Sequence, residues 1–113
     1  MKFEARLLTV GKKPEVDWKG KNATLFVEFP AAENHNRNIG TKEEPEWETV
    51  DTSWFQLHAW GDVAQKILDL KVDQGDAIKV EGQHKIRRVQ EENEKARYYN
   101  QYKITDIEKY PLD

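Results

Sequence analysis

The chain has 113 residues, a formal net charge of −3 and no cysteine, and 35% of its residues are charged. This length suits one domain that buries a core without disulfides, and the lack of cysteine excludes a thiolate metal site and a thiol nucleophile. No stretch has the apolar run of a signal peptide or the length of a membrane-spanning helix. We therefore expect one soluble domain over residues 1–113, in the cytoplasm, with no membrane partner.

Alternating apolar and polar residues predict two strands in the first third of the chain, over residues 3–10 and 23–29. Residues 11–14 and 18–22 predict turns, and Pro30 closes the second strand. Residues 32–49 are polar and keep no period for long. They predict either a long loop or a protruding hairpin, and loops of this length in compact domains are often functional.

A third strand is expected from Glu48 or Val50 to Trp60, and its two faces differ. Phe55, Leu57 and Ala59 suit a core. The other face carries Trp54, Gln56, His58 and Trp60. Two tryptophans separated by polar residues indicate a stacking platform for a ligand or half of a protein–protein contact.

After Gly61 the apolar period becomes helical and predicts a short helix that ends near Lys71. Asp62 and Gln65 resemble a capping box at its start. Two further strands follow, with a bend at Gly82, a charged hairpin tip at residues 90–95 and a return strand over residues 97–107.

Three strands, one helix and two strands are the layout of an OB-fold, an all-β, five-stranded Greek-key barrel with one short helix between strands 3 and 4. The strand and helix periods predict a single core. Its expected members are Leu7, Leu25, Val27, Phe55, Leu57, Ile67, Ile78, Val80 and Ile104.

The chain also resembles the bacterial-type single-stranded DNA-binding proteins over residues 3–108. The resemblance is carried by Leu8-Thr-Val-Gly11 with Pro14-Glu15-Val16, Thr52-Ser-Trp54, Ala59-Trp60-Gly61 before Val63-Ala64, the run Gly75-Asp-Ala-Ile-Lys-Val-Glu-Gly-Gln83, and Arg97-Tyr98. It is similar to a short member, because the chain stops at Asp113 without the flexible linker and acidic tail by which family members recruit partners.

The resemblance implies sequence-tolerant binding of single-stranded DNA in replication, recombination or repair, by a homodimer or homotetramer. Trp54 matches a stacking tryptophan of the family and Trp60 a stacking phenylalanine. Two further stacking positions, near residues 35–37 and at Val89, lack tryptophan, so weaker binding is expected. The expected phosphate contacts are Arg6, Lys12, Lys85, Arg87 and Lys103, with Arg37 as a clamp from the loop and Gln56 and His58 between the tryptophans.

The residues leave one alternative open, an OB-fold protein-interaction module that has lost most nucleic-acid affinity. The net negative charge and the two missing tryptophans favour it. An enzyme is not expected, because Ser53 lacks a nucleophile motif and the histidines lack ligand spacing. We therefore expect no catalytic residue, metal, cofactor or small-molecule substrate.

Overall fold

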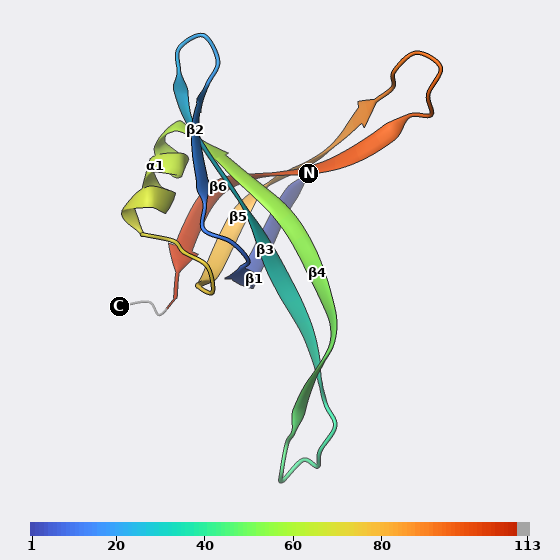
Figure 1. Cartoon of the computed structure of the whole chain (residues 1–113). Coiled ribbons are helices and arrows are strands. Elements are labelled where there is room, and N and C mark those ends of the chain that lie inside the picture. The colour runs from blue at the N-terminus through green and yellow to red at the C-terminus, as the bar shows by residue number, and fades with distance from the viewer. Residues whose placement is uncertain (111–113) are drawn as a thin grey trace.

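Within residues 1–110, the part that the structure describes, five long strands close into a barrel and a short sixth strand extends one edge (Figure 1). The side chain of Arg6 lies outside this part of the computed structural model. The strands are β1 (Lys2–Val10), β2 (Glu15–Lys19), β3 (Thr24–Asn38), β4 (Trp47–Trp60), β5 (Ala77–Val89) and β6 (Arg97–Lys109). Their order is β1-β5-β6-β4-β3-β2, and a further pairing of β1 with β3 closes the barrel. Only β4 and β6 pair in parallel among these described strands.

This architecture confirms the expected all-β OB-fold, with helix α1 (Gly61–Asp69) between the third and fourth barrel strands. Gly61 has a φ of 57°, a left-handed conformation that glycine adopts without steric cost, and the chain passes there directly from β4 into α1. Ala64 and Ile67 are the residues of the helix that are buried against the barrel. The predicted capping box is wrong, because Trp60 is the N-cap residue and no side chain caps the helix.

The turn predicted at residues 18–22 begins later than expected, because Trp18 and Lys19 belong to β2. This strand pairs with β3 from Glu15 opposite Glu28 to Lys19 opposite Thr24. All of β2 is exposed. Val16 and Trp18 do alternate with charged residues, but the run has only five residues and the turn predicted from Trp18 onward cuts it short.

Most of the predicted core is confirmed. Leu25, Val27, Leu57, Ile67, Ile78, Val80 and Ile104 are buried in one cluster, and Phe55 is half-buried against it. The prediction that Leu7 belongs to the core is wrong: Leu7 is 61% exposed, whereas its neighbour Leu8 is 1% exposed. A β-bulge explains the exchange: β1 has an extra residue between Ala5 and Leu8, so the alternation of its side chains shifts by one position.

Of the two readings for residues 32–49, the protruding hairpin is correct. β3 and β4 stay paired from Phe26 opposite Trp60 to Asn38 opposite Trp47, and only the tip between them is a loop. Pro30 does not close the strand. It falls between the stretch of β3 that pairs with β2 and the stretch that pairs with β1, where a residue without an N–H is tolerated.

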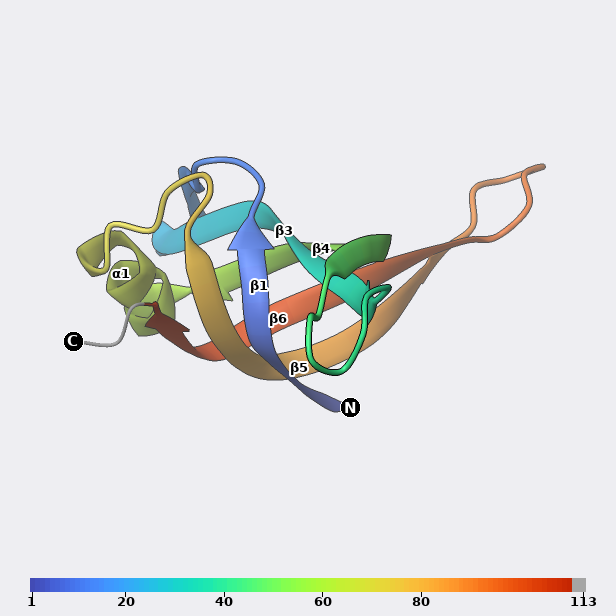
Figure 2. The same cartoon turned by 90° about the horizontal axis from the view of Figure 1, so that it is seen from below.

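Two hairpin arms therefore leave the barrel in different directions, one made of β3 and β4 and the other of β5 and β6 (Figures 1 and 2). The arms give the molecule principal extents of 58 × 43 × 23 Å. The second arm begins at a bulge between Glu81 and Gly82, as predicted from the glycine. No helix among the described residues is long and apolar enough to cross a membrane.

Candidate nucleic-acid interface

The outer face of β4 carries Trp54, Gln56, His58 and Trp60, as the strand period predicts. Opposite them on β3 lie Ala32, Pro30, Glu28 and Phe26. Trp54 is 64% exposed and Gln56 is exposed, whereas His58 is half-buried. The two tryptophans are six positions apart, which separates them by about 20 Å along an extended strand.

A groove of about 640 Å³ lies between this face and the β5–β6 arm. It brings together four residues predicted for the site: Gln56, His58 and Trp60 from β4, and Arg87 from the arm. The other lining residues are Lys19, Phe26, Glu28, Val89, Tyr99, Asn100 and Gln101.

A second hollow, of about 380 Å³, adjoins the first and contains Trp54 and Lys12. Gln56 and Glu28 line both, so the two hollows lie next to each other along β4, and together they are called the track on β4. The ring of Trp54 lies over Gly11, where a Cβ atom would come within 2.6 Å of its Cζ3. A glycine is therefore required under this tryptophan unless its ring moves.

Aromatic packing places Trp60 at the end of the groove. Its ring centroid is 4.7 Å from that of Phe26, a buried residue that was not predicted for the site. Lys19 Nζ lies 4.1 Å from the centre of the Phe26 ring. The result is a cation held over the Phe26 ring, which in turn packs against Trp60.

His58 lies between the tryptophans in a setting that disfavours its charged form. Burial and then the neighbouring Lys103 lower its pKa from 6.5, with a smaller lowering contribution from Lys19, and Glu28 opposes them. The imidazole is thus neutral at pH 7. It adds hydrogen-bonding capacity to the groove rather than charge.

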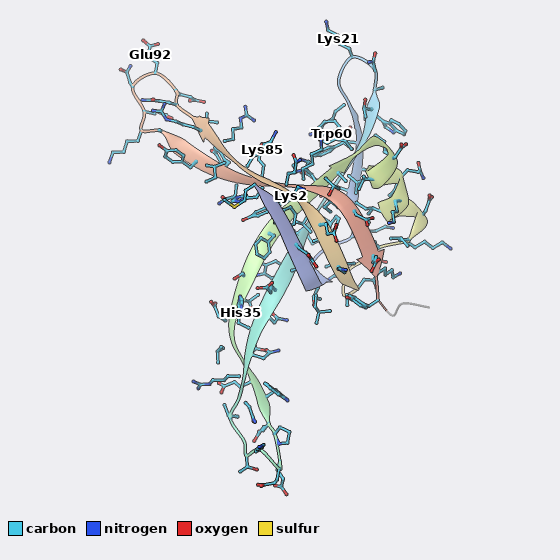
Figure 3. The ribbon with its side chains drawn as sticks, turned by 180° about the vertical axis from the view of Figure 1, so that it is seen from behind. Lys2, Lys21, His35, Trp60, Lys85 and Glu92 are labelled. Carbon is cyan, nitrogen blue, oxygen red and sulfur yellow. The ribbon has the colours of Figure 1, made fainter. Side chains whose placement is uncertain are left out.

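The remaining predicted residues lie outside the two hollows. Lys103 lies beside His58 on the neighbouring strand, and Lys85 pairs with Gln101 at the root of the β5–β6 arm (Figure 3). Arg37 is far out on the β3–β4 arm and forms an ion pair with Glu48 at 3.6 Å. Arg6 belongs to β1, and its side chain is outside the described part of the chain.

Tyr99 is the groove residue that sequence reasoning placed least well. β6 carries three tyrosines, Tyr98, Tyr99 and Tyr102, and none of them was predicted for the site. Tyr102 packs edge-on against Phe3 and Phe55, whereas Tyr98 and Tyr99 are exposed and only Tyr99 lines the groove. Alternation along β6 separates the faces of these neighbours, but it does not show which face meets the groove.

Comparisons with known proteins agree with this architecture. The model of the single-strand binding protein family matches residues 9–110. A small single-stranded DNA-binding protein from Streptomyces coelicolor superposes with a TM-score of 0.74 at 18% identity, covering 96% of this chain and 93% of that one. A Plasmodium falciparum SSB in complex with ssDNA superposes with a TM-score of 0.72 at 15% identity, covering 96% of this chain and 92% of that one. No curated protein sequence matches the chain.

A third structure is a deletion mutant of the single-stranded DNA-binding protein from Thermus aquaticus, with a TM-score of 0.68 at 16% identity. The match covers 96% of this chain and 49% of that one. At these identities the three structures establish a shared fold. The match over residues 9–110 goes further: the chain belongs to the single-strand binding protein family.

Proposed function

We propose that the chain binds single-stranded DNA without sequence preference along the track on β4. The observation that carries this proposal is that the two hollows adjoin, with Trp60 in one, Trp54 in the other and Gln56 lining both. Every base has a π-face, so stacking on tryptophan tolerates any sequence. The related Plasmodium SSB, which has this fold, is known in a complex with ssDNA.

Cations beside the track are the expected phosphate contacts. Lys12 lines the Trp54 hollow, and Arg87 lines the Trp60 groove from the opposite arm. Lys103 and Lys85 lie opposite groove residues on the neighbouring strand, Lys103 beside His58 and Lys85 beside Gln101. Their summed positive charge would attract the DNA backbone despite the net charge of −3.

Tyr99 extends the proposed site beyond the predicted residues. It lies on the arm that faces Trp60 across the groove, and its ring is exposed. An aromatic face on each wall suits a base inserted between the two walls of the groove. Tyr99 would thus offset part of the stacking lost at Val89, which lines the same groove.

The test is a titration of intrinsic tryptophan fluorescence with oligo-dT at two salt concentrations. We expect quenching, and an affinity that falls steeply with salt because bound phosphates release counterions. Trp54→Ala should weaken binding by about 1–3 kcal/mol. Trp18→Ala is the matched control, because Trp18 is 63% exposed on β2 and lines neither hollow.

Charge reversal separates phosphate contacts from stacking. Arg87→Glu should weaken binding to all sequences alike and flatten the salt dependence. Arg88→Glu is its control, because Arg88 lies on the other face of β5, where it donates a 2.7 Å hydrogen bond to Gln90. Unchanged emission with oligo-dT at low salt, or a folded Trp54→Ala protein with parental affinity, would refute the proposal.

Replication, recombination and repair generate single strands, and we place the proposed binding in these processes, in the cytoplasm. The competing function is an OB-fold protein-interaction module, favoured by Glu28 inside the groove and by the net negative charge. That function predicts no fluorescence response to DNA together with recovery of protein partners in a pull-down. Tight, salt-sensitive DNA binding would eliminate it.

A further inference from the structure

Gly11 directly follows β1, and hydrogen bonds to three other parts of the chain fix the backbone around it. Its N–H donates a 2.8 Å hydrogen bond to Pro30 O. The preceding residue, Val10, donates its N–H to Asp76 O at 2.9 Å and accepts a 2.8 Å bond from Gly75 N–H. The backbone at Gly11 therefore has little room to move away from a side chain that presses on it.

The backbone conformation does not explain why this residue is glycine. Among the described glycines, positive φ angles occur at Gly20, Gly61 and Gly75 and not at Gly11. An alanine could therefore adopt the same backbone conformation without strain. The missing side chain at Gly11 needs another reason.

The contact with Trp54 supplies that reason. A Cβ atom at Gly11 would lie 2.6 Å from Cζ3 and 3.2 Å from Cη2 of Trp54, both atoms of the six-membered ring of the indole. Because the backbone at Gly11 is fixed and Trp54 is 64% exposed, the indole and not the backbone would have to move. Gly11 thus lets the ring lie directly on the main chain.

This contact limits the freedom of the ring before any ligand binds. An exposed side chain on a strand samples several rotamers, and ordering it against a ligand costs entropy. The Trp54 ring already lies on Gly11, in a hollow that Pro30 also lines. Part of the ordering cost therefore falls on folding and not on binding.

We propose that Gly11 is a positioning residue for nucleic-acid binding, whose bare backbone holds the Trp54 indole in the orientation that stacks a base. This inference rests on the proposed function of the track on β4. Gly11 acts through Trp54. A side chain in place of the glycine would displace the indole and lower the affinity for DNA while leaving the barrel intact.

The test measures the affinity for labelled oligo-dT by the fluorescence anisotropy of the label, a signal that does not depend on tryptophan. Gly11→Ala should weaken binding about 5-fold or more, up to the loss caused by Trp54→Ala. In a Trp54→Ala protein the same substitution should cause no further loss, because no ring remains to be displaced. The urea midpoint of Gly11→Ala should not fall, because alanine suits the backbone and the ring can move into solvent.

Trp54→Phe provides a rescue of Gly11→Ala. A phenyl ring has a π-face for stacking but lacks the Cζ3 and Cη2 atoms that a Cβ at Gly11 would meet. Gly11→Ala should therefore cost little affinity in a Trp54→Phe protein, whereas a purely structural role of Gly11 predicts the same loss in every background. If Gly11→Ala alone fails to fold, the two Trp54→Phe proteins still decide: equal affinities support the inference, and a loss overturns it.

The outcomes separate this inference from the proposed function. A folded Gly11→Ala protein with parental affinity overturns the inference and leaves Trp54 as a stacking residue. Equal losses with and without the Trp54 ring also overturn it, because Gly11 would then not act through that ring. A Trp54→Ala protein with parental affinity refutes both proposals.

Discussion

Leu7 and Leu8 are adjacent residues of one type in opposite surroundings, and their difference can be measured. The bulge in β1 buries Leu8 in the core and exposes Leu7. Leu8→Ala should lower the free energy of unfolding by about 2–5 kcal/mol, through lost burial and the cavity left behind. Leu7→Ala is the internal control and should change it by about 0.5 kcal/mol or less. Urea denaturation of both variants decides whether the bulge is where the structure places it.

His58 should make stability depend on pH. Its pKa is lowered in the folded chain, mainly by burial and then by Lys103. Below about pH 6.5 the unfolded chain therefore takes up a proton that the folded chain resists, so the free energy of unfolding falls as the pH drops from 6.5 towards the folded pKa. Above pH 6.5 this contribution is fully present. Denaturation at pH 7.5 and 5.5 should show a smaller difference for His58→Gln than for the parent, and equal differences would contradict the assignment.

Among the elements, α1 is tied to the barrel by one ion pair as well as by its buried face. Lys66 Nζ donates a 2.6 Å hydrogen bond to Asp106 of β6, and this bond, followed by the Ile107 N–H, lowers the pKa of Asp106. Both side chains are about half exposed, so Asp106→Asn should cost less than about 1 kcal/mol. Its contribution is present above about pH 3.8 and is lost as the pH falls through the lower folded pKa. A loss as large as that of Leu8→Ala in a melt at pH 7 would show that the pair does more than tether the helix.

The element order was predictable because each barrel strand buries alternate residues, and the four outward residues of β4 followed from the same period. The failures have local causes. The bulge in β1 misplaced Leu7, and the five-residue strand β2 was missed because its end was read as a turn. On the other wall of the groove Arg87 was predicted for the site and Tyr99 was not, because the face of β6 that meets the groove is set only once the barrel has closed.

For the whole molecule, the open edge of β1 motivates a prediction about assembly. β1 pairs with β3 only at Thr9 and Val10, so within residues 1–110 the edge around the exposed Leu7 has no strand neighbour on that side. Pairing of two copies along this edge would satisfy the backbone and bury Leu7. Light scattering at micromolar concentration should give the mass of a homodimer or homotetramer, and Leu7→Glu should reduce it. A monomeric mass for the parent would exclude this assembly.

The parallel pairing of β4 with β6 has a consequence for how the barrel opens. It consists of Leu57 opposite Tyr102 and His58 opposite Lys103, contacts between segments far apart in sequence. Such a short, long-range seam is where local opening costs least. The groove spans it, with His58 on one side and Gln101 on the other. Single-stranded DNA bound in the groove would contact both sides of this pairing and oppose its opening. Binding should therefore slow hydrogen exchange at the amides of Leu57 and Tyr102, two residues that line neither hollow.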